Sequence, residues 1–156
     1  MLLGEVIRTL DDRFRLTLPA DMAAGLCPDG ADACMLAKER PGCVSLWPLA
    51  RRQAQIDEAV ALVRGKLDSG RLAGRQREVQ ALGRLLSTRH QTAPLAGRGR
   101  LVVPEGFREF LGVEPGGSVV VIGAAVCVEV WRPDAWAQCV GDEAPRFDAM
   151  LEDLIG

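Results

Sequence analysis

The stretch that decides the fold is Arg13-Phe-Arg-Leu-Thr-Leu-Pro19, because a close match, Arg98-Gly-Arg-Leu-Val-Val-Pro104, follows it in the second half of the chain. A second pair of matching segments, Cys43-Val-Ser-Leu-Trp47 and Cys127-Val-Glu-Val-Trp131, has almost the same separation. Two matched blocks with nearly equal separations indicate an internal duplication. The sequence therefore predicts two copies of one unit of about 50 residues, joined by a central insert.

Both copies predict the same order of elements, namely two strands, a short helix and two further strands. In the first copy we expect strands at 5–10 and 15–18, a helix that ends at residue 26, and strands at 35–38 and 43–47. In the second copy we expect strands at 90–95 and 100–103, a helix at 105–111, and strands at 118–122 and 126–131. Pro19 and Pro104 suit the first turn of the two helices, since proline lacks the N–H that would be unpaired there.

The segments outside the copies are predicted to be helical. Between the copies, apolar residues at helical spacing predict one helix over 51–66 and a second that carries Val79, Leu82 and Leu86. Intervening glycines favour a helix–turn–helix over a single rod; they are Gly65, Gly70 and Gly74. After the second copy we expect a short helix from Pro133 through Trp136, and then an amphipathic helix near the C-terminus.

The composition is that of a globular chain with an uneven charge distribution. Its 156 residues are 48% hydrophobic and 26% charged, with a formal net charge of −2, which argues against disorder. Residues 51–100 carry eleven basic and four acidic groups, whereas residues 101–156 carry three basic and ten acidic groups. A positive middle third favours a polyanionic partner, although richness in arginine can also reflect genome composition alone.

Several classes of protein are not expected. No apolar run approaches the roughly 20 residues that span a bilayer, and the N-terminus lacks the pattern of a secretory signal. Five cysteines without a C-x-x-C pair, together with one histidine, predict reduced thiols and no metal site. No nucleophile-elbow, P-loop or H-E-x-x-H motif occurs, so we expect no catalytic residue, no cofactor and no small-molecule substrate. The three tryptophans are interpreted as packing residues; they are Trp47, Trp131 and Trp136.

The repeated segments resemble the MraZ family of bacterial transcriptional regulators. The resemblance covers most of the chain and rests on Met1-Leu-Leu-Gly4, Leu10-Asp-Asp-Arg-Phe-Arg-Leu-Thr-Leu-Pro19, Leu46-Trp47-Pro48, Gly99-Arg-Leu-Val-Val-Pro104, Phe107-Arg-Glu-Phe-Leu-Gly112 and Val128-Glu-Val-Trp131 followed by Trp136. It implies an α+β fold of two tandem swapped-hairpin β-barrel units of the AbrB/SpoVT type, related by a pseudo-twofold axis. The expected domains are unit 1 at 1–48, a helical insert at 49–87, unit 2 at 88–141 and a C-terminal amphipathic helix at 142–156.

The function implied by the resemblance is that of a sequence-specific DNA-binding transcriptional regulator. Such a protein binds direct repeats in a promoter as a ring-shaped homo-oligomer, represses the division and cell-wall gene cluster, and is cytoplasmic and nucleoid-associated. Its partner is double-stranded DNA, and no membrane is involved. Two other readings stay open: an oligomeric scaffold of the same fold that has lost DNA binding, and an antitoxin-like partner protein.

The candidate DNA-binding residues are arginines in or beside the turn that follows the first strand of each copy: Arg13, Arg15, Arg98, Arg100 and, one step upstream, Arg8. Arginine contacts phosphate or guanine in the major groove. In the alternative interpretation, one arginine of each pair is held by a carboxylate such as Asp11, and Arg8 lies on a solvated strand. The arginines of the insert either steer DNA or pair with the acidic C-terminal third of a neighbouring subunit, and we favour pairing.

The turn itself is predicted to depend on Asp11 and Gly99, which match the D-x-x-G-R motif of the family. The chain departs from that motif at Phe14, where glycine is usual, and at Ala96, where aspartate is usual. If the glycine position requires a positive φ, Phe14 costs roughly 1–2 kcal/mol there and the first loop takes another shape. Without an aspartate to hold backbone N–H groups, the second loop is expected to be less rigid.

Overall fold

Eight antiparallel strands form the centre of the computed structural model, which describes residues 2–156. Met1, the first residue of the segments that carry the family resemblance, lies outside the described residues. The first unit consists of β1 (Leu2–Thr9), β2 (Arg15–Thr17), α1 (Ala20–Leu26), β3 (Ala33–Arg40) and β4 (Cys43–Pro48). The second consists of β5 (His90–Ala96), β6 (Arg100–Val102), α4 (Glu105–Leu111), β7 (Ser118–Ala125) and β8 (Val128–Trp131). The predicted β-β-α-β-β order is confirmed in both units.

The strands of the two units interleave in the order β1-β7-β8-β4-β3-β5-β6-β2. The sheet nearly closes into a barrel, because the Arg8 side chain of β1 donates a hydrogen bond of 3.1 Å to the carbonyl of Thr17 in β2. Exchanging each strand for its counterpart in the other unit leaves this closed order unchanged. Leu16 pairs with its counterpart Leu101, and Ser45 pairs with its counterpart Glu129, so the pseudo-twofold axis passes through both pairs. The predicted pseudo-twofold relationship is confirmed.

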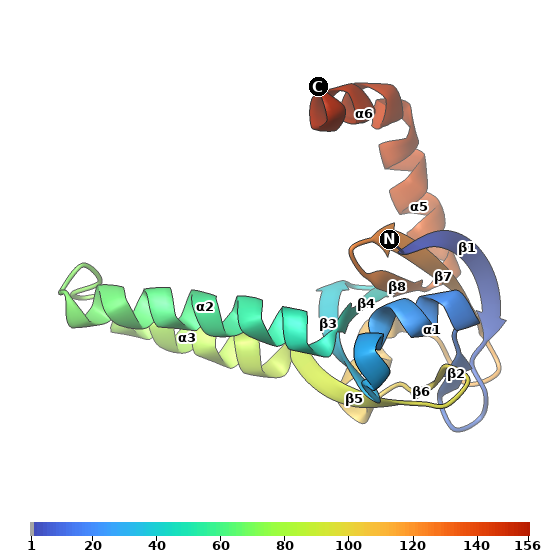
Figure 1. The fold of residues 1–156 in the computed structure, drawn as a ribbon, viewed down its shortest axis with the longest axis horizontal. Coiled ribbons are helices and arrows are strands. Elements are labelled where there is room, and N and C mark those ends of the chain that lie inside the picture. Colours follow the sequence, from blue (N-terminus) through green and yellow to red (C-terminus); the bar gives the residue numbers. More distant parts are fainter. Residues whose placement is uncertain (1) are drawn as a thin grey trace.

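The core of the barrel is built from equivalent residues of the two units. Met22 and Leu26 of α1, and their counterparts Phe107 and Leu111 of α4, are each at most 2% exposed. Burying a side chain of this size contributes about 1.5–3 kcal/mol. Each short helix thus packs one apolar face against the barrel core. Figure 1 shows α1 lying over the barrel.

Several boundaries differ from the predicted ones. Pro19 and Pro104 stand immediately before α1 and α4 as N-cap residues, not in the first turn. The strand predicted to begin at residue 126 begins at Val128, because the chain reverses at Ala125, where φ is 67°. The N–H of Ala124 bonds to the carbonyl of Cys127 across this reversal.

The insert is a two-helix arm that projects from the barrel, which confirms the predicted helix–turn–helix (Figure 1). Its helices are α2 (Leu49–Asp68) and α3 (Gln76–Thr88). Gly70 and Gly74 lie in the connection with a φ of 80° each, whereas Gly65 lies inside α2. No residue of either helix is buried.

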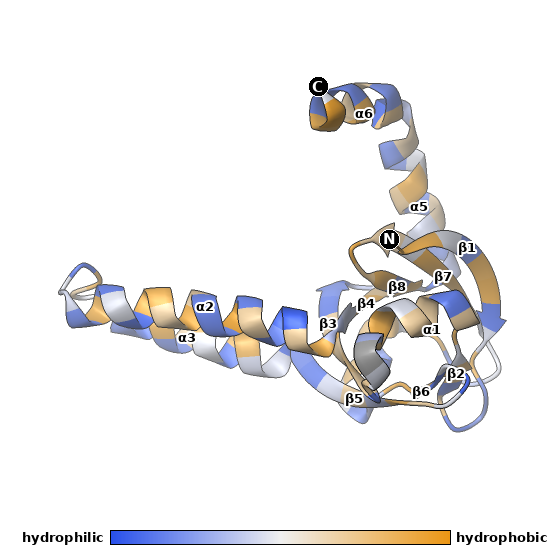
Figure 2. Cartoon of the chain, in the orientation of Figure 1, coloured by the Kyte–Doolittle hydropathy of each residue, from blue (hydrophilic) through white to orange (hydrophobic). Residues whose placement is uncertain are grey.

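A second projection follows the last strand and consists of α5 (Pro133–Glu143), η2 (Ala144–Arg146) and α6 (Phe147–Ile155). The prediction that the first of these helices stops near Trp136 is wrong. The helix continues because Cys139, one turn further along the same face, is buried in a small cluster with Trp131. The predicted C-terminal amphipathic helix is present, and its apolar residues are exposed (Figure 2). No helix within residues 2–156 is long and apolar enough to cross a membrane.

Candidate nucleic-acid interface

The outer face of the β2–β6 ribbon gathers arginines from both units. Leu16 and Leu101, at its centre, point into the core and are each 1% exposed. Because side chains alternate along a strand, their neighbours Arg15 and Arg100 point outward and are exposed. Arg15 stands opposite Val102, and Arg100 opposite Thr17, so the two guanidinium groups lie on one diagonal of the same face.

Arg8 joins this face from the neighbouring strand β1. Its Nε donates to the carbonyl of Thr17, the residue that stands opposite Arg100. A shallow polar hollow of about 410 Å³ lies here and is lined by Arg8, Thr9, Asp11, Arg15, Thr17 and Arg100. Three of the five arginines predicted to bind DNA therefore share one exposed surface, which we call the ribbon face.

Arg13 and Arg98 lie at the two ends of the ribbon face. Each belongs to the bend that leads into its strand, bend 1 (residues 11–15) or bend 2 (residues 96–100). Because β2 and β6 are antiparallel, these bends lie at opposite ends of the ribbon. Both side chains are exposed, and within residues 2–156 neither forms an ion pair. Their contact with DNA stays a prediction.

Bend 1 is organised by Asp11. One carboxylate oxygen accepts the backbone N–H groups of Arg13 and Arg15 at 2.8 Å each, and the other accepts Nε of Arg15 at 2.6 Å. The N–H of Arg15, followed by its guanidinium group and the N–H of Arg13, outweighs burial and holds the pKa of the Asp11 carboxyl below its usual value. Arg15 is therefore held by a carboxylate, as in the alternative interpretation of these arginines. Arg100 lies opposite Ala96 in bend 2 and has no carboxylate partner within the described chain.

The glycine position of the motif has a positive φ in both bends, 58° at Phe14 and 78° at Gly99. The hydrogen bond across the turn is also the same, from Phe14 N to Asp11 O at 3.1 Å and from Gly99 N to Ala96 O at 3.0 Å. The bends differ one residue earlier, because Arg98 has a φ of 71°, whereas Arg13 is not among the residues with positive φ. The two loops thus share the turn hydrogen bond and the positive φ at the glycine position. They differ in shape at Arg13 and Arg98 and not at Phe14, so the expected effect of Phe14 on the loop is not found.

Packing explains why phenylalanine is accommodated in one bend and glycine in the other. A Cβ atom on Gly99 would lie 2.8 Å from the carbonyl oxygen of Leu18 and 3.1 Å from Cβ of Ala23 in α1. The counterpart of Ala23 in α4 is Arg108, whose guanidinium group lies over the ring of Phe14 at 4.2 Å. The small residues Gly99 and Ala23 thus meet at one bend, and the large residues Phe14 and Arg108 stack on each other at the other. The sequence analysis did not identify Arg108 as a partner of the bend. Its position in the second copy, which is equivalent to that of Ala23 in the first, could have indicated this contact.

The arginines of the insert divide into three groups. Arg52 stacks on Trp47 with 4.1 Å between the guanidinium carbon and the ring centre, and Arg89 donates to the carbonyl of Lys38. Both therefore anchor the base of the arm to the barrel. Arg75 pairs with Glu78 at 2.6 Å near the tip. The others are exposed without an ion pair in the part of the chain described: Arg51, Arg64, Arg71, Arg77 and Arg84.

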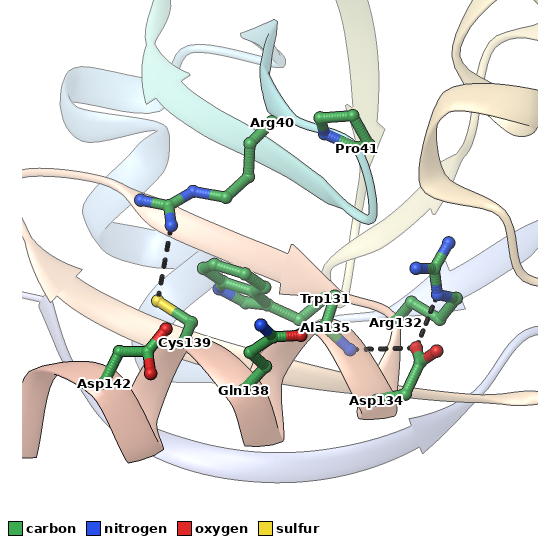
Figure 3. Close-up of a pocket in the computed structure, with 9 residues that line it drawn as sticks. All are labelled: Arg40, Pro41, Trp131, Arg132, Asp134, Ala135, Gln138, Cys139 and Asp142. Atoms are coloured by element: carbon green, nitrogen blue, oxygen red, sulfur yellow. Dashed lines mark hydrogen bonds and ion pairs between the residues drawn. The ribbon is translucent and has the colours of Figure 1, made fainter.

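A second hollow, of about 310 Å³, lies between the β3–β4 turn and α5 (Figure 3). Two of its charged groups, Arg132 and Asp134, form an ion pair at 2.5 Å, and Arg40 donates to the sulfur of Cys139 at 3.7 Å. Burial, aided by Glu143, raises the pKa of the Cys139 thiol to about 11. The contacts around this hollow therefore help to hold α5 on the barrel. The thiol of Cys139 is protonated near neutral pH.

The three tryptophans, predicted to be packing residues, each contact another side chain. Trp131 is buried and packs against Trp136 with 5.4 Å between ring centres, whereas Trp47 is half-buried. Cys43 and Cys127 are buried free thiols. His90 bonds to the carbonyl of Leu86 through Nδ1 at 2.9 Å.

Comparison with known proteins finds a matching family model and similar proteins of nearly the same length. A family model described as "MraZ protein, putative antitoxin-like" matches residues 91–154. Proteins named "Transcriptional regulator MraZ" are similar over nearly the full chain. The one from Leuconostoc mesenteroides is 28% identical over 155 residues, covering 99% of this chain and 97% of that protein. The one from Heliobacterium modesticaldum is 26% identical with the same coverage, and the one from Thermus thermophilus is 25% identical over 98% of both chains.

Proposed function

This chain belongs to the MraZ family and is a transcription regulator, and we propose that it acts by binding double-stranded DNA through the ribbon face and its two bends. The observation that carries the proposal is the convergence of Arg8, Arg15 and Arg100 on one exposed face, with Arg13 and Arg98 at its ends. Rigid two-pronged guanidinium groups match phosphate oxygens and the major-groove edge of guanine. No cofactor is needed for such binding.

Self-association is the second part of the proposal. A two-helix arm without a single buried residue gains little stability from its own packing, and it exposes apolar side chains such as Leu62 and Leu85. We infer that another copy covers this arm, with the basic arm pairing with an acidic C-terminal third. Several ribbon faces in one ring then bind repeated sites at a high effective concentration.

The target follows from the family resemblance. We propose that the protein occupies direct repeats in a promoter, that of the division and cell-wall gene cluster, and represses it. This role places the protein on the nucleoid in the cytoplasm.

The test is a fluorescence-anisotropy titration of the full chain against the region upstream of its own operon at two salt concentrations. Binding through the ribbon face predicts an affinity that falls with a log–log slope of about −0.9 per phosphate contacted. Arg100→Ala weakens binding while oligomer mass and unfolding temperature stay unchanged. The absence of binding at low salt would overturn the proposal.

One observation favours a second candidate, the oligomeric scaffold without DNA binding. The carboxylate of Asp11 neutralises Arg15, an arginine at the centre of the proposed interface. Under this reading the chain assembles through its arms but does not bind the upstream DNA at any salt concentration. The antitoxin-like reading has less support, because the C-terminal residues form the helix α6 and not an extended tail.

A further inference from the structure

The two bends carry different charge, although they occupy equivalent places in the fold. Bend 1 contains two acidic and two basic residues, Asp11, Asp12, Arg13 and Arg15, and has no net charge. Bend 2 contains Arg98 and Arg100 with no acidic residue, and its net charge is +2. The two bends therefore share the pair of arginines, but only bend 1 contains carboxylates.

We propose that DNA binding is asymmetric within each chain, with bend 2 providing the dominant contacts and bend 1 the weaker ones. This inference rests on the proposed function and adds to it which half of the molecule holds the DNA.

The first argument concerns the availability of the guanidinium groups. Arg15 is held by Asp11 at 2.6 Å, so a phosphate must share or displace this partner while lying close to a carboxylate of like charge. Asp11 cannot easily move away, because the same carboxylate holds two backbone N–H groups of the bend. Arg100 forms no ion pair within residues 2–156, so it reaches a phosphate without displacing a partner.

The second argument is that another cation reinforces bend 2. Arg8 is fixed by its hydrogen bond to the carbonyl of Thr17, and Thr17 stands directly opposite Arg100. Arg8 on β1 and Arg100 on β6 therefore lie on either side of Thr17 in β2, at the end of the ribbon nearest Arg98. Neighbouring positive charges raise the local potential for a polyanion.

The third argument concerns access to the backbone. A Cβ atom on Gly97, at the outer part of bend 2, would have no heavy atom within 4 Å, so this backbone is open to a ligand. The base of the same bend is fixed, because Gly99 is buried and its carbonyl accepts the N–H of Leu18 at 2.9 Å. Bend 2 thus presents an open, positively charged tip on a fixed base.

The test compares matched arginine pairs in the full-length oligomer, using anisotropy with the operon's upstream duplex at fixed salt. We expect Arg98→Ala and Arg100→Ala each to weaken binding about tenfold or more, and Arg13→Ala and Arg15→Ala each about threefold or less. The salt slope should fall by about one unit for Arg100→Ala and by less for Arg15→Ala. Arginine-to-glutamine variants repeat the comparison wherever an alanine variant lowers the unfolding temperature.

A second pair of variants tests the role of the carboxylate. Asp11→Asn keeps an oxygen that accepts the backbone N–H groups but releases Arg15, so binding should tighten several-fold. Asp12→Asn makes the same change in net charge one residue away, where no ion pair is formed, and should tighten binding less. Equal losses from both bends, a larger loss from bend 1, or equal effects of the two asparagine variants would overturn the inference. A wild-type protein that binds no DNA would instead overturn the proposed function itself.

Discussion

At the scale of single residues, the most informative comparison is between Phe14 and Gly99, which occupy equivalent positions with positive φ. Phe14 is accommodated because the guanidinium group of Arg108 covers its ring, whereas Gly99 abuts the carbonyl of Leu18. The same backbone conformation is therefore compatible with a large side chain in one unit and with none in the other. The difference lies in the neighbouring helix and not in the bend.

We expect Gly99→Ala to destabilise the protein by at least about 1–2 kcal/mol, since the added Cβ atom combines left-handed strain with a contact to Leu18. Chemical denaturation of the two proteins measures the difference. Gly97→Ala is the matched control in the same bend, because its Cβ atom meets nothing and its φ is not positive. Equal stabilities of the two variants would show that the close contact is relieved without cost.

Asp11 makes bend 1 sensitive to acid. Because the pKa of its carboxyl is lowered in the folded protein, the stability it contributes is fully present above the unfolded value near 3.8 and is lost as the pH falls through the folded value. The difference in unfolding midpoint between the wild type and Asp11→Asn should therefore be constant above about pH 5 and shrink below pH 4. A difference that does not change with pH would mean that the ion pair contributes nothing.

At the scale of elements, the main contrast is between the barrel and its projections: the former contains the buried core, whereas α2, α3 and α6 bury no residue. An apolar hollow of about 190 Å³ runs between α2 and α3 and is lined by Val60, Val63, Arg64, Leu67, Val79, Leu82, Gly83 and Leu86. We therefore expect the arm to depend on the proposed covering partner for much of its stability. Assembly and arm structure should therefore be lost together.

Replacing an apolar residue of this hollow tests that dependence. If a second copy covers the arm as proposed, we expect Leu82→Glu to lower the oligomer mass in sedimentation velocity, because a charge is placed on the proposed contact surface. Gln80→Glu adds the same charge to an exposed polar position of α3 and should leave the mass unchanged. The unfolding of the barrel should be similar in both variants. Identical masses would show that the arm does not carry the contact.

The sequence was sufficient to predict most elements, because each is marked by local signals. The helices that end at Leu26 and Leu111 and the helix–turn–helix insert follow from apolar spacing, prolines and glycines. It was not sufficient for features that depend on contacts across the chain. The stacking of Arg108 on Phe14 joins different units, and the full length of α5 depends on the burial of Cys139 against the barrel.

The candidate site could be predicted as a set of arginines but not as a geometry. Their position beside the turns follows from the repeat, whereas their grouping depends on the pairing of β2 with β6, two strands from different halves of the chain. Local patterns do not encode which strand of one unit lies beside which strand of the other. Only the structure shows that Arg15 is engaged by Asp11 while Arg100 is not.

At the scale of the whole molecule, the two units form one cooperative body. β1 of the first unit pairs with β7 of the second, and β5 of the second pairs with β3 of the first. A unit of about 50 residues buries too little surface to be stable alone. Each unit therefore completes the sheet of the other, and neither is expected to fold independently.

This interdependence predicts a single unfolding transition for the barrel. Leu16→Ala and Leu101→Ala each remove a buried side chain beside the pseudo-twofold axis and should each cost about 2–5 kcal/mol. Because the two leucines stand directly opposite each other, the double variant should cost less than the sum of the single variants. Two separate transitions in calorimetry, or loss of only half of the sheet signal in one variant, would contradict a shared core.

The point at which the arm leaves the barrel has a consequence for how such a protein diversifies. α2 starts directly after β4, and α3 ends just before β5. Because β4 and β5 lie on either side of β3, the sheet fixes the distance between the two ends of the insert. Whole turns can be added to or removed from both helices at the far tip without shifting the register of any strand. The length of the arm can thus change during evolution, while the ribbon that carries the arginines stays unaltered.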